Sequence, residues 1–112
     1  MADFIYLFRG GRTQESSPEQ MQQEMQKWRV WIDELGKKGH FKGGDPLDRT
    51  GKVVSGKQKV VTDGPYAEAK DIVGGYLLVA AENIAQATDL AKGCPIFDQQ
   101  HGSVEVRAVM KM

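Results

Sequence analysis

The side chains with the richest chemistry in this chain surround one Gly-Pro pair. Two carboxylates, a phenol and an amine lie close together in the sequence there, namely Asp63, Tyr66, Glu68 and Lys70. Gly64 and Pro65 interrupt strand pairing and turn the chain. We therefore expect the four polar side chains on a connection, where binding and catalytic groups tend to lie.

Asp63 is the candidate general base. Val60 and Val61 before it should pair in the sheet, which would leave Asp63 at the mouth of a cleft between the first helix and the sheet. Partial burial beside Tyr66 would then suit Asp63 to acid–base chemistry, with Tyr66 as a second catalytic candidate. The structural alternative is that Asp63 caps its own turn by accepting backbone N–H bonds.

Two histidines, His40 and His101, could also take part in proton transfer near neutral pH. Both are expected on loops, because each adjoins a glycine. We take His40 as an assisting catalytic candidate, and a surface position without function is the alternative for either residue. Two distant histidines without an H-x-x-x-H or cysteine partner make a poor metal site, so no metal is expected.

Four side chains are candidates for substrate binding. Glu68 and Lys70 follow the Gly-Pro turn, although they could equally form a solvated pair of little energetic value. Arg107 shares one face of the last predicted strand with Glu105, and it could anchor a carboxylate or phenolate. A salt bridge to an acidic neighbour is the alternative for Arg107. Trp28 continues an apolar helical stripe, so a place in the core or an interface competes with substrate contact.

The elements that must position these groups follow from apolar spacing and turn residues. Ser17 and Asn83 each cap a predicted helix, with a glutamine three residues later. A strand is expected at 3–9, a helix from Pro18 to Gly36, short strands at 52–54 and 58–61 within a glycine-rich, β-like stretch at 40–62, a strand at 72–81, a second helix ending at Gly93, and a strand at 103–111. This order predicts an α+β, ferredoxin-like βαββαβ sandwich, as one domain over residues 1–112.

Two of these strands are apolar on both faces, at 4–8 and 76–80. In an antiparallel sheet with helices on one side, the other face should be polar. The economical cover for a second apolar face is another copy of the same sheet. We therefore expect a two-fold homodimer with a continuous core.

Composition excludes several classes of protein. The 15 basic and 15 acidic residues of the 112 cancel, which argues against general binding of nucleic acid. No apolar run approaches membrane-spanning length, and the N-terminus lacks a signal-peptide pattern. The single Cys94 allows no internal disulfide, which fits a soluble, cytoplasmic protein. Because no G-x-G-x-x-G or Walker sequence is present, no nucleotide or other cofactor is expected.

The stretch Val61–Lys70, followed by Gly74-Gly75-Tyr76, resembles the signature of the YCII-related family in its DGPF branch. Tyr66 stands where that branch usually carries phenylalanine. The segments 43–47, 91–95 and 104–107 also match, so the resemblance covers essentially the whole chain. It implies a dimeric α+β barrel, in agreement with the strand pattern.

The resemblance implies less about activity. The family's shorter branch pairs a helix histidine with an aspartate, and the corresponding places here hold about Trp28 and Lys38, which cannot do that job. Any activity must therefore rest on other groups. The family also includes a dechlorinating enzyme acting on a chlorinated aromatic ring, and DGPF members are often accessory proteins to extracytoplasmic-function sigma factors.

Three functions compete on these grounds. The first is a cofactor-free enzyme that transfers protons on a small aromatic or carboxylate substrate, with Asp63 as base, His40 and Tyr66 assisting, and Arg107 holding the anion. The second is a non-catalytic ligand-binding or regulatory module linked to transcription through a sigma factor. The third, a heme- or oxygen-dependent monooxygenase, follows only from related dimeric barrels, and no heme-ligand pattern supports it.

Overall fold

The computed structural model describes residues 1–11, 17–65 and 71–112. Its strands are β1 (Ala2–Arg9), β2 (Phe41–Pro46), β3 (Gly51–Ser55), β4 (Val60–Gly64), β5 (Val73–Ala81) and β6 (Ser103–Ala108). Its helices are α1 (Pro18–Lys37), α2 (Ile84–Ala91) and the short 3-10 helix η2 (Pro95–Asp98). None of these helices is long and apolar enough to cross a membrane.

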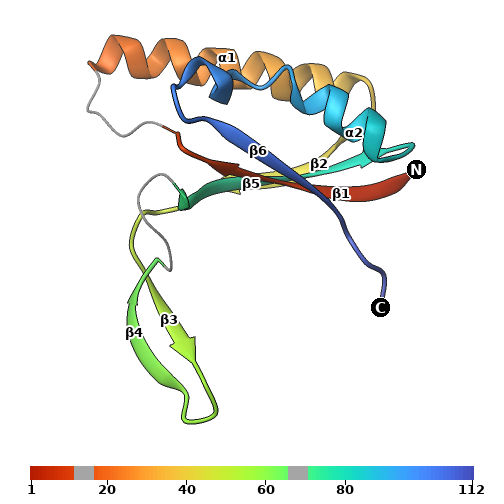
Figure 1. Ribbon diagram of the computed structural model, residues 1–112. Coiled ribbons are helices and arrows are strands. Elements are labelled where there is room, and N and C mark those ends of the chain that lie inside the picture. Colours follow the sequence, from red (N-terminus) through yellow and green to blue (C-terminus); the bar gives the residue numbers. More distant parts are fainter. Residues whose placement is uncertain (12–16, 66–70) are drawn as a thin grey trace.

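Four strands form one antiparallel sheet in the order β2-β5-β1-β6. Both long helices cover the same face of this sheet (Figure 1). The fold is therefore the α+β, ferredoxin-like arrangement that the sequence predicted. No described helix covers the opposite face, which we call the open face.

Helix α1 begins where its sequence signals place it. The Ser17 side chain accepts a hydrogen bond from the backbone of Gln20, and the Gln20 side chain accepts one from the backbone of Ser17, which completes a capping box. Pro18 occupies the first turn, where its missing N–H costs nothing. Asn83 caps α2 in the same way, by accepting from the backbone N–H of Gln86 at 2.9 Å. Both predicted helix starts are confirmed.

The core lies between the helices and the sheet and is rich in aromatic rings. Alternate residues of β1, namely Phe4, Tyr6 and Phe8, are buried under the helices. The Tyr6 ring stacks on Trp31 of α1 with centroids 6.2 Å apart. The Tyr6 hydroxyl donates to the Ala87 carbonyl of α2, and the Trp31 indole N–H donates to the Leu90 carbonyl at 3.2 Å. These bonds tie both helices to one aromatic cluster.

The open face carries the other residues of the same strands. Register pairs Ile5 with Leu78 and Leu7 with Tyr76, and all four are half-buried although no helix packs on them. As expected, these strands carry apolar side chains on the open face as well as on the face beneath the helices. The second copy expected to cover this face stays a prediction.

One expectation about the sheet is wrong. Val60 and Val61 do not pair in the main sheet; they pair with Ser55 and Val54 in a separate two-stranded hairpin, β3–β4. The strand that completes the main sheet is β2, from within the glycine-rich stretch. The hairpin is therefore an insertion between β2 and β5, and it projects away from the sheet on the side of the open face (Figure 1).

The reason for this error lies in the glycines of β2. Gly44 has a φ of +156°, and a Cβ there would collide with the Tyr76 carbonyl and with Leu77 on β5. Glycine is needed for this close approach, yet glycine lowers β propensity and conceals the strand in the sequence. The last strand also ends earlier than expected, at Ala108 instead of residue 111.

A candidate ligand pocket beneath helix α1

A pocket of about 570 Å³ opens between α1, η2 and one end of the sheet. This volume falls in the range of sites for small organic molecules. Its walls are mainly apolar. They are formed by Phe8, Gly11, Glu24, Met25, Trp28, Arg29, Ile32, Gly44, Asp45, Pro46, Gly74, Gly75, Tyr76, Leu77, Pro95, Ile96, Asp98 and Gln99.

Glycines account for the space at the floor of the pocket. Gly75 of β5 lies in register with Phe8 on one side and with Pro46 on the other. It is buried, and a Cβ there would lie only 3.2 Å from the Asp45 carbonyl oxygen and 3.3 Å from the Pro46 Cα. Gly44 lies opposite Leu77, on the same helix-facing side. At the floor of the pocket, β2 and β5 thus carry glycines without side chains, next to the bulky Phe8 and Leu77.

Helix α1 supplies the roof. Trp28 is half-buried, and its ring meets Phe8 edge-on with centroids 5.1 Å apart. Trp28 also contacts Trp31 edge-on at 5.8 Å, so the core holds its orientation. Met25, one turn earlier, lines the same space and is 54% exposed. The N-terminal half of the helical apolar stripe therefore roofs the pocket, whereas the C-terminal half, with Trp31 and Leu35, fills the core.

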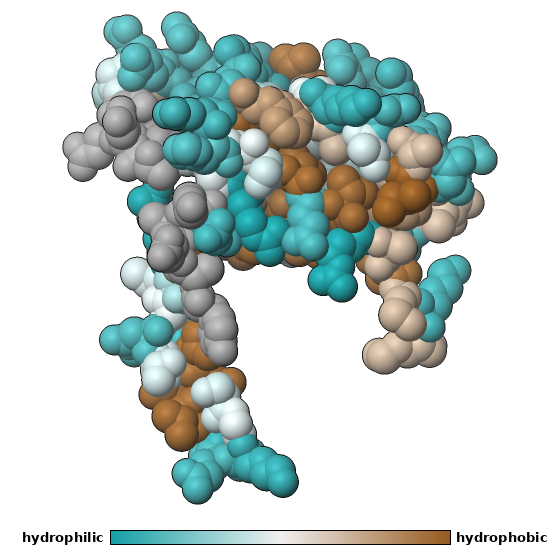
Figure 2. Space-filling view, viewed as in Figure 1, coloured by the Kyte–Doolittle hydropathy of each residue, from teal (hydrophilic) through white to brown (hydrophobic). Residues whose placement is uncertain are grey.

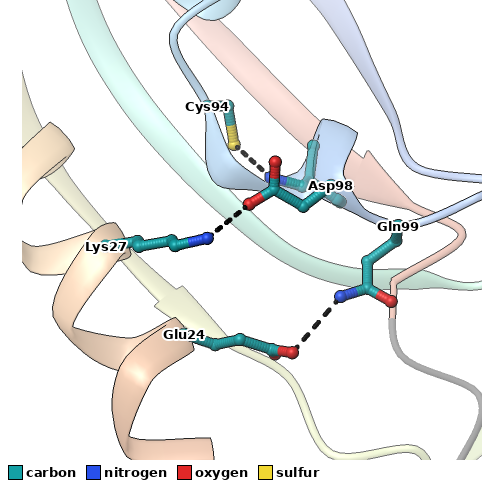
Figure 3. A network of polar contacts seen from close by, with 6 residues as sticks. Glu24, Lys27, Cys94, Asp98 and Gln99 are labelled. Carbon is teal, nitrogen blue, oxygen red and sulfur yellow. Dashed lines mark hydrogen bonds and ion pairs between the residues drawn. The ribbon is translucent and has the colours of Figure 1, made fainter. Parts of the chain in front are cut away.

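Two polar contacts join α1 to η2 along one side of the pocket. The Lys27 ammonium lies 3.1 Å from the Asp98 carboxylate, and the Gln99 amide donates to Glu24 at 3.4 Å (Figure 3). Glu24, Asp98 and Gln99 all line the pocket. These groups hold η2 against the helix and place two carboxylates at the wall.

Cys94 lies just behind this wall and is buried. Its Sγ accepts a hydrogen bond from the Ile96 N–H at 3.5 Å, at the start of η2 (Figure 3). Burial raises the pKa of the thiol to about 12, so it is neutral at physiological pH. Cys94 serves as a packing and capping residue.

Asp45 and Tyr76 form a second polar pair beside the pocket. The Tyr76 hydroxyl donates to the Asp45 carboxylate at 3.2 Å. This hydrogen bond, together with the negative charge of Asp45, raises the pKa of Tyr76. Since both residues adjoin the floor glycines on strands whose side chains alternate, the pair marks the edge between the pocket and the open face.

Of the catalytic candidates from the sequence, the two in the described part of the chain, Asp63 and His40, do not line this pocket. Asp63 lies on β4, where its side chain is 88% exposed and pairs with Lys52. The predicted position of Asp63, in a cleft between α1 and the sheet, is therefore wrong, because the hairpin carries it away from both. Tyr66, Glu68 and Lys70 lie outside the described residues.

His40 also lies away from the pocket and is buried. Its Nδ1 is 2.7 Å from the Ala80 carbonyl oxygen, its backbone N–H donates to Leu35, and its carbonyl accepts from the Ala80 N–H. These bonds lock the connection from α1 to β2 against β5. Among the described residues, His40 is the buried polar side chain, and its bonds join the end of α1 to β5.

Two binding candidates have clear positions. Trp28 lines the pocket, as a substrate-contacting residue would. Arg107 does not; it is exposed, opposite Ile5, on the open face of the sheet. Glu105 shares this face as expected, and its carboxylate pairs with Arg9 at 2.6 Å. The cleft that Arg107 was expected to face is on the other side of the sheet.

No group of three or more histidine, cysteine, aspartate or glutamate side chains suited to a metal ion occurs in the described part of the chain. The pocket residues that sequence reasoning missed include the floor glycines, Glu24 and Met25 of α1, Ile96 and Asp98 of η2, and Gln99 just after η2. Only Gly75 gave a usable signal, because a glycine within a buried strand often marks a close approach.

A family model for the YCII-related domain matches residues 6–112, nearly the whole chain. The protein belongs to the YCII-related family. The resemblance stated from the sequence is thereby confirmed at the level of the family, and membership of its DGPF branch stays a prediction. Comparison with curated protein sequences gives no match.

Among solved structures, the YCII-related chain is similar to 5-chloro-2-hydroxyhydroquinone dehydrochlorinase from Burkholderia phenoliruptrix, in complex with 2,5-dihydroxybenzoquinone. The TM-score is 0.55 at 16% sequence identity, and the match covers 96% of this chain and 93% of the dehydrochlorinase chain. At this identity the similarity shows a shared fold.

Proposed function

We propose that this YCII-related protein binds a small, flat, mainly apolar organic molecule of aromatic type in the pocket beneath Trp28. The observation that carries the proposal is the pocket itself: an indole and a phenyl ring stand at its wall, and the floor is opened by Gly44 and Gly75. Aromatic walls with few polar groups favour flat apolar ligands. The solved structure with the same fold holds a quinone, which agrees with this ligand class.

We further propose acid–base chemistry on that ligand, without a cofactor. The specific support is the pair of carboxylates, Glu24 and Asp98, that line the pocket beside the apolar walls. A carboxylate within reach of a bound ring hydroxyl can accept its proton. In this proposal Glu24 takes the part that the sequence gave to Asp63.

The active form in this proposal is a homodimer closed over the open face. The support is the row of half-buried apolar side chains there, Ile5, Leu7 and Leu78, which no described helix covers. Pairing two identical faces about a two-fold axis would remove this surface from water. The transcription-linked accessory module stays the alternative, and a neighbouring gene for an extracytoplasmic-function sigma factor would favour it.

A pair of glycine variants tests ligand binding. Gly75→Ala adds a methyl group at the floor of the pocket, whereas Gly36→Ala adds one on α1, outside the pocket, where no atom that it would meet lies within 4 Å. We expect Gly75→Ala to weaken binding of 2,5-dihydroxybenzoquinone about tenfold or more, the effect of one methyl group in an apolar pocket. Gly36→Ala should bind like the unmodified protein. Titration calorimetry gives both dissociation constants, and equal constants for the two variants would refute binding in this pocket.

Chemistry is tested separately from binding. Glu24→Gln keeps the shape of the side chain and its ability to accept from Gln99, but removes the carboxylate. If Glu24 accepts a hydroxyl proton from a bound chlorinated hydroquinone while the ring expels chloride, so that HCl is lost overall, turnover should fall by about a hundredfold or more with little change in affinity. Unchanged turnover would remove Glu24 from the mechanism, and the absence of any turnover in the unmodified protein would leave a binding function alone.

A further inference from the structure

The β3–β4 hairpin exposes apolar side chains that nothing else in the described chain covers. Val54 is 63% exposed and Val61 is 59% exposed, and register places them opposite each other on one face of the hairpin. The Lys52–Asp63 ion pair lies on the same face, nearer the sheet. Apolar surface gathers along the middle of this hairpin (Figure 2).

The hairpin makes its extensive contacts within itself, between β3 and β4. A lone two-stranded hairpin is marginally stable in water unless another surface packs on it. Its two short strands and Gly-Lys turn supply little else to hold it. Its exposed valine face therefore needs a partner surface.

A second exposed apolar segment lies at the other end of the open face. After β6, the chain continues through Val109 and Met110, which are 43% and 86% exposed, to Met112, which is fully exposed. This C-terminal segment and the hairpin project on the same side of the sheet, at opposite ends (Figure 1). Between them lie the apolar side chains of the open face.

The exposed area is larger than a compact monomer of this size needs. A 12.4 kDa monomer is expected to expose roughly 6,100 Å², whereas this chain exposes 8326 Å². The surplus, roughly 2,200 Å², exceeds the about 800 Å² that each partner buries in a standard stable interface. The radius of gyration is 15.5 Å, against about 13 Å for a compact chain of this length.

We propose that the β3–β4 hairpin is an exchange arm, whose Val54–Val61 face lies against the partner subunit beside the partner's C-terminal segment. The proposal rests on the homodimer proposed above and adds which surfaces meet. When two open faces stack about a two-fold axis through their centre, perpendicular to the line from hairpin to tail, each hairpin reaches the tail end of the other copy. The valines and methionines then cover one another.

Charge placed on the two faces of the hairpin tests the arm. Val54→Lys/Val61→Lys should raise the dimer dissociation constant at least about 30-fold, the effect of losing a central interface residue. The matched control, Ser55→Lys/Thr62→Lys, adds the same charge on the opposite face of the hairpin. It should change the dimer dissociation constant less than about threefold. Sedimentation equilibrium measures all three proteins, with far-UV circular dichroism as the check on folding.

Cross-linking tests which surfaces meet. When Val61→Cys and Met110→Cys proteins are mixed, exchanged and oxidised, we expect a disulfide-linked pair of chains that joins one variant to the other. Mixing Ser55→Cys with Met110→Cys should give no such pair, and the native Cys94 is buried.

The two proposals fail differently. An unmodified protein that sediments as a monomer at micromolar concentration would refute both the dimer and the arm. If the unmodified protein is a dimer, the proposed dimer stands and the arm is tested separately. The arm is refuted if Val54→Lys/Val61→Lys leaves the dimer dissociation constant unchanged. It is also refuted if Val61→Cys and Ser55→Cys cross-link equally to Met110→Cys.

Discussion

The four-stranded sheet and the β3–β4 hairpin are built from similar residues but are stabilised by opposite means. In the sheet, Tyr6 and Val79 are fully buried, a hydrogen bond from Tyr6 ties α2 to the sheet, and one from Trp31 ties α1 to α2. In the hairpin, Val54, Val60 and Val61 are more than half exposed. Valine forms a strand in either setting, so the residue type favours the local strand conformation. The packing against neighbouring residues decides how much each valine stabilises the fold.

This difference shows which part of the chain is self-sufficient. The sheet and its helices bury their apolar face within one chain, so they account for folding of the monomer. The hairpin buries little, so its contribution depends on what it meets outside the chain. Substitutions in the two regions should therefore separate folding from association.

The largest effect is expected in the aromatic cluster. Trp31→Ala removes a ring that is 5% exposed and stacks on Tyr6, so the free energy of unfolding should fall by about 3–5 kcal/mol. Val60→Ala, on the face of the hairpin opposite Val54, should change it by less than about 0.5 kcal/mol. Urea denaturation measures both, and comparable losses would abolish the distinction between the two regions.

A smaller effect is expected from Tyr6→Phe. This variant keeps the ring but leaves the buried Ala87 carbonyl without its donor, which should cost about 1–3 kcal/mol. Tyr76→Phe loses an exposed bond to Asp45 and should cost less than about 1 kcal/mol. Equal losses in urea denaturation would show that the Tyr6 hydroxyl does not tie α2 to the sheet.

Alkaline pH should weaken the core. Burial raises the pKa of Cys94 from 9.0 to about 12 and that of Tyr6 from 10.0 to about 12. The unfolded chain therefore loses these protons before the folded chain does. Their stabilisation is complete below about pH 9 and is lost as pH rises from about 9 to 12. Cys94→Ala should flatten the fall between pH 9 and 10 in urea denaturation, and an unchanged slope would contradict this origin.

The smallest effect is expected from Asp63→Asn. Its ion pair with Lys52 joins two exposed side chains, so the free energy of unfolding should change by less than about 0.5 kcal/mol. Affinity for 2,5-dihydroxybenzoquinone should also stay within about twofold, because Asp63 does not line the pocket. A tenfold loss of affinity by calorimetry would instead restore Asp63 as a site residue.

The sequence was sufficient for the fold but not for the place of one strand. Helix caps at Ser17 and Asn83 are local hydrogen-bond patterns, so they can be read from short segments. The choice of β2 over β4 as the sheet strand depends on a close approach of Gly44 to Tyr76 and Leu77, which are distant in sequence. Local propensity favours Val60 and Val61, and the tertiary packing overrides it.

The pocket was harder to predict than the fold for a related reason. Polar residues near a turn drew attention to Asp63, but the cavity arises where side chains are missing, at Gly75 and Gly44. Trp28 was recognised as a stripe residue and a binding candidate, and only the three-dimensional structure shows that the stripe changes from core to roof along α1. The ion pair between Lys27 and Asp98 holds η2 against α1. These two segments are distant in the sequence, and no sequence motif links them.

The two ends of the hairpin insertion leave and re-enter the sheet at adjacent strands. The Leu47 N–H donates to the Gly74 carbonyl at 2.9 Å, just beyond the pairing of Pro46 with Gly75. A segment whose ends are already held together can be lengthened, shortened or replaced at little cost in loop-closure entropy. In evolutionary terms, the hairpin and the pocket can therefore diverge independently, because none of the described residues between 48 and 65 lines the pocket.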